Sequence, residues 1–297
     1  SGQDTWVLGS VADICPGLDA PAGAQYGSAL THMGYSAHSG AASFYIGAPL
    51  WDSADFRGAT GQVQGLTWSN GSLTPHPVEP SLVQQAHAGD EFGSALLNIP
   101  DVSGDELCDL AIGAPGYNGG GTVVIAFRRQ GSMQLDWGFA TLNGRGPTRP
   151  LRLASTARLG ASLALAPVSD GFGRLSMWVG MPGVSHPGCS GCGVALRMQQ
   201  GSAEDTGLPL HIAAWSLDST TPLAAGASMA TLVESSTHTL GRLLVGAPGS
   251  LDGTGEFILH HHGRNPGLDH RFAPAHNSCA LIDAEGAHHA SNYVDLG

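Results

Sequence analysis

The sequence predicts an all-β protein built from four repeats of about 66 residues, and composition is the first observation behind this prediction. Only 12% of the 297 residues are charged, whereas glycine occurs 44 times and proline 18 times. Long surface helices need charged faces, so this balance favours short strands joined by tight turns. The second observation is a recurring Gly-Ala-Pro signal, once Gly-Met-Pro. The signal ends at Pro49, Pro115, Pro182 and Pro248, so successive copies are 66, 67 and 66 residues apart.

A second glycine signal recurs with the first, as the sequences YGSAL, FGSAL, LGASL and AGASM. In every repeat its glycine, here called the leading glycine, lies 20 residues before the glycine of the Gly-Ala-Pro signal. Coincidence explains four equal offsets poorly, so the offsets indicate one structural unit repeated along the chain. The leading glycines are Gly27, Gly93, Gly160 and Gly226.

Each repeat contains four candidate strands in the same order. The first strand follows the leading glycine, and the second ends in the Gly-Ala-Pro signal, where proline ends the ladder. The third is an apolar run of strand length after a glycine-rich turn, starting at Gly61, Gly121, Cys192 and Gly255. The fourth is less regular, with candidates near Leu82, Pro150, Leu210 and His270.

A repeat of this length with four strands has the size of one β-propeller blade. The paired glycine signals resemble the FG-GAP repeats of the integrin alpha-subunit β-propeller and of its bacterial and fungal relatives, some of them lectin-like. The resemblance covers residues 20 to 262 and implies a single β-propeller domain over residues 1–297. Its repeats would occupy approximately residues 20–85, 86–152, 153–219 and 220–285.

Four repeats leave open how the ring of sheets closes, because an open side would expose strand edges. One hypothesis places Thr5–Asp13, within residues 1–19, as a closing strand that forms the outer strand of the last blade. A disulfide between Cys15 and Cys279 would then lock the two ends together. The alternatives are an arc that belongs to a longer propeller and a fifth blade assembled from the two ends.

An acidic loop, DVSGDELCD, lies between the first and second strands of the second repeat. It resembles the calcium hairpins of integrin propellers. Calcium prefers six to eight hard oxygen ligands, which carboxylates, a hydroxyl, a carbonyl and water can supply. The other three loops lack the acids, so one calcium ion is predicted, and an Asx-type turn with solvated carboxylates is the alternative. The candidate ligands are Asp101, Ser103, Asp105 and Asp109, at loop positions 1, 3, 5 and 9, and the Leu107 carbonyl.

The remaining cysteines and a histidine run permit disulfide or metal chemistry. Cys189 and Cys192 lie in a glycine-rich turn that no helix pattern follows, so a local disulfide is favoured over a redox motif. A zinc site that includes His186 is the alternative. Cys108, at a strand entry, is predicted to be a buried free thiol. The three histidines at 260–262 are predicted to be solvated or satisfied in the core.

The resemblance also implies a ligand-binding face. In the resembling propellers, the loops between second and third strands and between blades form this face, opposite the calcium hairpins. An aromatic side chain with flanking polar groups suits a sugar or a peptide side chain. Solvated loop residues without a ligand are the alternative. Carried over by position, the face would hold Trp51, Arg57, Tyr117, Asn118, His186 and Asp252.

Charge and motif content restrict the function classes. The net charge is −12 and the chain has no lysine, so phosphate backbones are repelled and a nucleic-acid partner is disfavoured. No apolar run approaches the length that spans a bilayer. Five cysteines in an acidic, glycine-rich chain favour a secreted or cell-surface location. The sequence contains no nucleophile elbow, no His-Glu-x-x-His helix and no phosphate loop, which weakens an enzymatic interpretation.

These features predict an extracellular binding or adhesion module that recognises carbohydrate or protein ligands and is braced by calcium and disulfides. Two alternatives stay open. The first is a lyase or hydrolase of extracellular polymers on the same scaffold, and the second is a structural component of a larger surface assembly.

Overall fold

The protein is all-β, as predicted. The computed structural model describes residues 23–36, 41–52, 58–69, 72–77, 88–101, 107–126, 139–141, 156–166, 176–185, 191–200, 210–213, 224–232, 242–249, 255–261, 270–275, 278–282 and 288–289. Within these ranges, strands alternate with turns, and the one helical element is the 3-10 helix η1 (Tyr117–Gly119). None of the helical structure in this part of the chain has the length and apolar character needed to cross a membrane.

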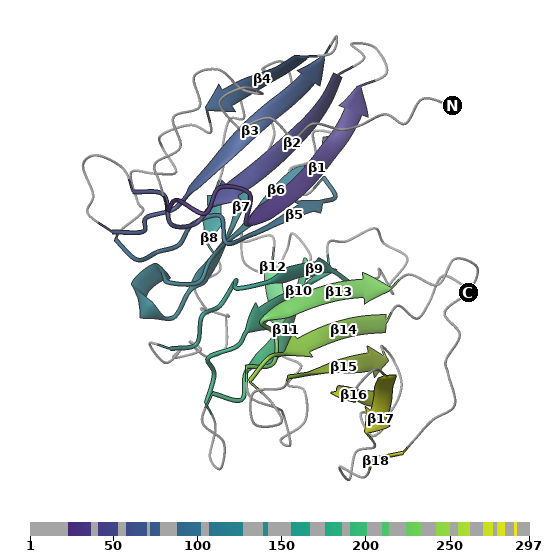
Figure 1. Ribbon diagram of the computed structural model, residues 1–297. Coiled ribbons are helices and arrows are strands. Elements are labelled where there is room, and N and C mark those ends of the chain that lie inside the picture. The colour runs from purple at the N-terminus through teal and green to yellow at the C-terminus, as the bar shows by residue number, and fades with distance from the viewer. Residues whose placement is uncertain are drawn as a thin grey trace.

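The strands form four antiparallel sheets, each from consecutive strands of one stretch of the chain (Figure 1). The first sheet contains β1 (Ala29–Ser36), β2 (Ala41–Ala48), β3 (Gln62–Ser69) and β4 (Ser72–Pro77). The second contains β5 (Ala95–Ile99), β6 (Asp109–Ala114), β7 (Thr122–Ala126) and β8 (Phe139–Thr141). The third contains β9 (Leu163–Leu165), β10 (Ser176–Met181), β11 (Val194–Gln200) and β12 (Leu210–Ala213).

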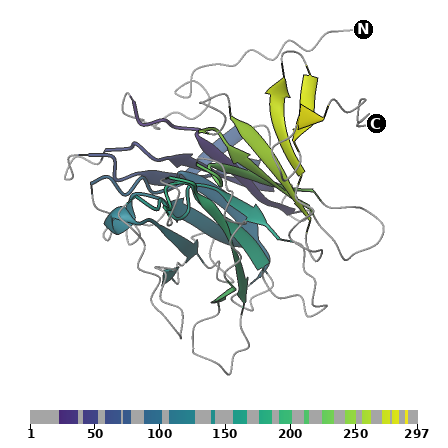
Figure 2. The ribbon, with the colours of Figure 1, turned by 90° about the horizontal axis from the view of Figure 1, so that it is seen from below.

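The fourth sheet is larger than the others. It begins with β13 (Ser228–Leu232), β14 (Arg242–Ala247), β15 (Glu256–His261) and β16 (His270–Ala275). Two further strands, β17 (Ser278–Ile282) and β18 (His288–His289), extend it beyond the predicted four. Figure 2 shows the yellow strands β16 and β17 projecting from the rest of the molecule.

The first three strands of every sheet lie where the two glycine signals predict them, but two of the four predicted fourth strands are misplaced. Strands β12 and β16 start at the predicted Leu210 and His270. In the first two sheets the fourth strands are β4 and β8, well before the predicted positions near residues 82 and 150, which lie outside the described residues. In the first sheet, Ser69 pairs with Ser72, so only Asn-Gly separates β3 from β4. Asn-Gly between two strands is a strong signal for a two-residue hairpin.

Consecutive sheets share their hydrophobic cores. Strands β1, β5, β9 and β13 pack against one another in chain order. One core lies between the first and second sheets, a second between the second and third, and a third between the third and fourth. Strands β6 and β10 are buried on both faces because each has a neighbouring sheet on either side. Among the described strands, no pairing joins the first sheet to the fourth.

Candidate functional site

The two ends of each sheet carry different loops. The loop from first to second strand lies at one end, and the loop from second to third strand lies at the other, because neighbouring strands are antiparallel. In the second sheet, Ile99 pairs with Asp109 at the first end, and Ala114 pairs with Thr122 at the second. The predicted calcium hairpin and the predicted ligand loops therefore lie at opposite ends of this sheet.

The predicted calcium hairpin joins β5 to β6. Asp109 is the first residue of β6 and its side chain is fully buried, while Asp101 and Leu107 are half-buried in the loop. Ser103 and Asp105 lie outside the described residues. Carboxylate and carbonyl oxygens at these positions are the hard donors that calcium prefers. Within the described residues alone, no three His, Cys, Asp or Glu side chains form a metal-binding group.

The equivalents of Asp109 in the other sheets are not acidic. Sixteen residues after the leading glycine, the other repeats have Ser43, Ser176 and Arg242. Ser176 is buried, and the buried Arg197 donates a hydrogen bond from Nε to its Oγ at 2.9 Å. In the third sheet a serine bonded to a guanidinium therefore takes the position of the buried carboxylate in the second sheet, so the two sites differ in charge.

At the opposite end, the loop after β2 fixes Trp51 by its backbone. The Trp51 nitrogen donates to the Ala48 carbonyl at 3.0 Å, and the Trp51 carbonyl accepts from the Gly61 nitrogen at 3.1 Å and the Thr60 hydroxyl at 3.0 Å. The Gly58 nitrogen donates to an Asp52 carboxylate oxygen at 3.1 Å. The Trp51 side chain is half-buried and Asp52 is exposed. An aromatic surface and an acid are thus held side by side in a braced loop.

The equivalent loop after β6 contains η1. Tyr117 is half-buried against the core between the first two sheets, and its carbonyl accepts a hydrogen bond from the Gly121 nitrogen at 2.8 Å. Asn118 is exposed and left-handed, with φ 48° and ψ 26°. Asparagine adopts this conformation more readily than most residues. The predicted face residues Trp51, Tyr117 and Asn118 therefore lie at the same end of neighbouring sheets.

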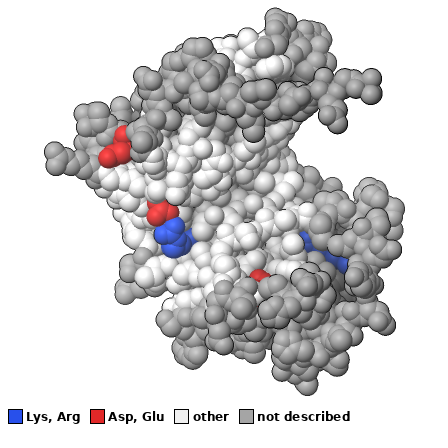
Figure 3. Space-filling view, viewed as in Figure 1, with Lys and Arg blue, Asp and Glu red and all other residues white. Residues whose placement is uncertain are grey.

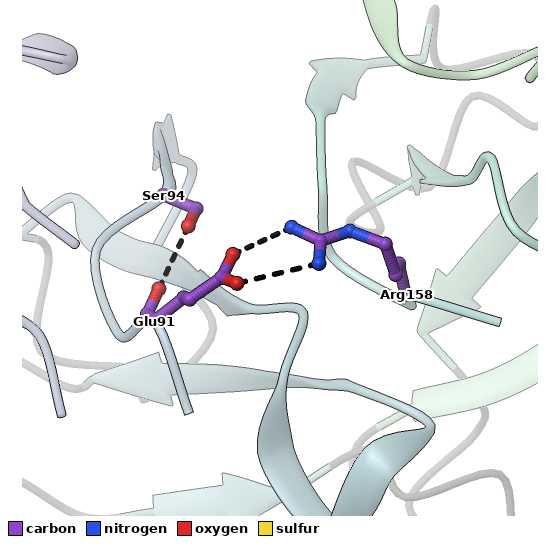
Figure 4. A network of polar contacts seen from close by, with 3 residues as sticks. All are labelled: Glu91, Ser94 and Arg158. Carbon is purple, nitrogen blue, oxygen red and sulfur yellow. Dashed lines mark hydrogen bonds and ion pairs between the residues drawn. The ribbon is translucent and has the colours of Figure 1, made fainter. Parts of the chain in front are cut away.

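The end of the sheets that carries Trp51 and Tyr117 also has an ion pair that the sequence analysis did not predict. Glu91 and Arg158, which lie two residues before their leading glycines, form a two-armed salt bridge between the second and third sheets (Figure 4). Their Nη2 to Oε2 distance is 2.5 Å, and the side chains are 24% and 47% exposed, respectively. The Glu91 carbonyl also accepts a hydrogen bond from the Ser94 hydroxyl at 2.8 Å. In the view of Figure 3, one acidic and one basic patch lie side by side, and the other charged patches of the described residues are scattered.

The ion pair lies next to the Trp51 loop. The Ala59 carbonyl accepts hydrogen bonds from the Gly89 and Glu91 nitrogens, both at 3.1 Å, and the Phe92 nitrogen donates to the Thr60 carbonyl at 3.0 Å. The segment that holds Trp51 therefore also holds Glu91. The signal that could have identified the pair is the spacing of 67 residues between Glu91 and Arg158, which equals one repeat step.

The four residues at this repeat position share one backbone conformation. Each is left-handed although none is glycine, and the nitrogen three residues later donates to its carbonyl. The residues, with their φ values, are Gln25 (53°), Glu91 (54°), Arg158 (57°) and Ala224 (60°).

A hollow of about 340 Å³ lies along the first strands of the second, third and fourth sheets. Its lining is mostly apolar and comes from β5, β9 and β13, with residues that include Leu97, Leu163, Leu165, Met229 and Thr231. Among the described residues that line this hollow, the one polar side-chain group is the Thr231 hydroxyl.

The cysteines agree with the predictions in part. Cys192 is buried and disulfide-bonded, but its predicted partner Cys189 lies outside the described residues, so that pairing stays a prediction. Cys108 is free, as predicted, but the prediction that it is buried is wrong. It immediately precedes β6, and successive side chains of a strand point to opposite sides. Since Asp109 takes the inward position, Cys108 is exposed.

An exposed free thiol predicts the reactivity of the native protein. Ellman's reagent should titrate Cys108 in the folded, unreduced protein, and Cys108→Ser should abolish this reaction. If both predicted disulfides form, full denaturation without reductant should expose no further thiol. Additional thiols on denaturation would contradict the predicted pairs.

Several other predictions fall outside the described residues. Of the two described strand tryptophans, Trp178 in β10 is buried at 2% exposed, whereas Trp68, near the end of β3, is 45% exposed. The backbone of Cys279 lies in β17. The remaining predicted residues without a structural description are Thr5–Asp13, Cys15, Arg57, Ser103, Asp105, His186, Cys189, Asp252 and His262.

Comparison with known proteins gives no family assignment. No protein-family model matches the chain, and no curated protein matches its sequence.

Proposed function

We propose that this protein is a secreted, calcium-braced β-propeller of the FG-GAP type that binds carbohydrate or protein ligands through one face. This face, called the loop face, comprises Trp51, Tyr117 and Asn118 with the Glu91–Arg158 ion pair.

The order of the sheets supports the propeller architecture. Each of the four sheets follows its predecessor in the chain, and each consecutive pair shares a hydrophobic core. The first strands of all four sheets pack in the same order. Radial repetition of small sheets around inner strands is the arrangement that defines a propeller.

The single observation that carries the binding function is the bracing of the Trp51 loop next to a pair of charged side chains. An indole ring offers a flat apolar surface for a sugar ring or an apolar peptide side chain. The neighbouring carboxylate, guanidinium and amide groups can exchange hydrogen bonds with hydroxyl or peptide groups. Backbone hydrogen bonds to Trp51 lower the entropy lost when a ligand binds, because the loop is already ordered.

A binding screen tests this proposal. The purified protein is applied to an array of glycans and extracellular matrix proteins, in calcium and separately in chelator. We expect a ligand whose binding weakens at least about tenfold in Trp51→Ala, the loss of an aromatic hot spot. Calcium at the opposite end would act through stability, so chelator should weaken binding less than this substitution does.

Trp68→Ala is the matched control. Trp68 is a second tryptophan with solvent-accessible surface, but it lies near the end of β3 that is remote from Gly61 and the Trp51 loop. Its substitution should leave binding unchanged. Equal losses in the two variants, or no ligand for a protein verified as folded, would refute the loop face as the binding site.

A further inference from the structure

The contact between consecutive sheets is built in the same way three times. In the first three repeats, the glycine of the Gly-Ala-Pro or Gly-Met-Pro signal lies against the carbonyl oxygen of the next leading glycine. A Cβ atom added to this glycine would stand only 2.0 Å from that oxygen. The contact leaves no room for any side chain at the receiving glycine. The three glycine pairs are Gly47 with Gly93, Gly113 with Gly160, and Gly180 with Gly226.

Hydrogen bonds repeat across the same three contacts. The residue before each leading glycine donates its nitrogen to the preceding sheet, at 3.0 Å from Phe92 to Thr60, 2.9 Å from Leu159 to Gly120, and 2.9 Å from Ala225 to Cys192. In the third contact, the buried Ser162 hydroxyl also donates to the Gly226 carbonyl at 2.7 Å. The contact thus has an inserting half, the turn at the leading glycine, and a receiving half, the Gly-Ala-Pro glycine and its surroundings.

The fourth sheet carries a receiving half that no described residue of another sheet covers. Gly246 is the equivalent of Gly180, but the atoms nearest to its missing Cβ belong to Ser228 of its own sheet. Ser228 is exposed, whereas its equivalent Ser162 is 8% exposed. Leu244 is half-buried, whereas its equivalent Trp178 is 2% exposed. The site retains the residues of a sheet contact without the sheet.

The first sheet carries the matching inserting half, and none of the described residues covers it. No described atom lies within 4 Å of where a Cβ of Gly27 would stand. Leu30 is 65% exposed, whereas its equivalent Leu163 is 9% exposed. Ile46 on β2 is half-buried, whereas its equivalent Ile112 on β6 is fully buried. Exposed apolar side chains clustered at one contact indicate an interaction surface.

We propose that a second copy of this chain docks head to tail, with the inserting half of its first sheet on the receiving half of the fourth sheet. Within one molecule, Leu30 and Ser228 are exposed at the same time, so none of the described segments fills the receiving half. At this contact, Ala224 of the fourth sheet and Gln25 of the first sheet would take the positions that Glu91 and Arg158 have between the second and third sheets. Neither side chain is charged, so the two do not repel each other. Two such contacts, related by a twofold axis, close a dimer that leaves neither half exposed.

The test is the association state of the 297-residue chain, measured by sedimentation equilibrium. We expect twice the 30.3 kDa chain mass for the wild type. Leu30→Glu, which places a charge on the inserting half, and Ser228→Arg, which fills the receiving half, should each sediment at 30.3 kDa. Both positions are exposed, so neither change removes a buried contact of the single chain.

Mixing the two variants gives the decisive result. Leu30→Glu retains an intact receiving half and Ser228→Arg an intact inserting half, so an equimolar mixture should form a one-to-one complex through a single contact. Because this complex has one contact where the wild type has two, it should dissociate at higher protein concentration. Leu165→Glu, which places the same charge on an exposed apolar residue of the third sheet, outside both halves, should remain dimeric.

Three outcomes would overturn the proposal. A monomeric wild type at all concentrations would assign the two halves to closure within one chain. A dimer that survives both substitutions would show that another surface associates. Two monomeric variants that do not combine on mixing would exclude a head-to-tail contact, and since each variant is checked by circular dichroism, misfolding cannot account for that result.

Discussion

Substitution Gly113→Ala should destabilise the protein by about 3 kcal/mol, the upper range for overpacking a buried site. The added Cβ would lie 2.0 Å from the Gly160 carbonyl oxygen and 3.3 Å from the Ala95 Cβ. Gly113 does not have a positive φ, so the cost comes from space alone. The opposing atom belongs to the backbone and can move only if the third sheet shifts away from the second. The loss is a large fraction of a typical stability of about 5–15 kcal/mol.

Gly246→Ala is the matched control for this prediction. It introduces the same methyl group at the equivalent position of the fourth sheet, where the nearest atom is the Ser228 hydroxyl oxygen at 2.2 Å. A hydroxyl can rotate away, so the expected loss is about 1 kcal/mol or less. Urea unfolding followed by circular dichroism measures both, in a Leu30→Glu background that removes any contribution from association. Equal losses in the two variants would contradict the sheet contact described above.

Calcium should raise the melting temperature by roughly 5–10 °C relative to chelator, because an ion at about one hundred times its Kd stabilises the folded state by about 2.7 kcal/mol. Asp109→Asn should abolish this difference in melting temperature, because it replaces the fully buried carboxylate of the hairpin with an uncharged amide. Differential scanning fluorimetry in calcium and in EGTA measures the effect, and titration calorimetry measures the binding itself.

Ser43→Ala and Ser176→Ala are the controls for the calcium prediction. These residues occupy the position of Asp109 in the first and third sheets, where the sequence provides no acidic loop. Both variants should keep the full calcium-dependent shift, although Ser176→Ala should lower stability by removing the hydrogen bond from Arg197. A wild-type melting temperature that does not respond to calcium would leave the acidic hairpin as a turn without an ion.

The strands that the sequence predicts correctly are those fixed by glycine. The leading glycine and the Gly-Ala-Pro glycine touch the neighbouring sheet, so their identity and spacing are forced by the contact and are visible in the sequence. The fourth strands face no such constraint at the sheet edge. Their position depends on local turns, and in the first sheet the Asn-Gly sequence after Ser69, a strong hairpin signal, is consistent with the observed pairing of Ser69 with Ser72.

The sequence predicted those residues of the candidate site whose place follows from their position in a loop. Trp51, Tyr117 and Asn118 were found because they follow the Gly-Ala-Pro signal directly. Glu91 and Arg158 were missed because their partnership depends on how consecutive sheets pack, and the only sequence signal of it is their spacing of one repeat step. The exposure of Cys108 depends on the exact residue at which β6 begins, which sequence patterns locate poorly.

The left-handed turn before each leading glycine has an evolutionary consequence. Most residues pay a modest conformational cost there, yet the turn carries a neutral amide at Gln25, an acid at Glu91, a base at Arg158 and a methyl group at Ala224. The backbone is the same in all four, so its hydrogen bonds, rather than side-chain identity, maintain it. Mutations at these positions can therefore change the chemistry presented by the loop face one repeat at a time while the framework stays constant. Under the proposed binding function, such separation would let ligand specificity diverge faster than the fold.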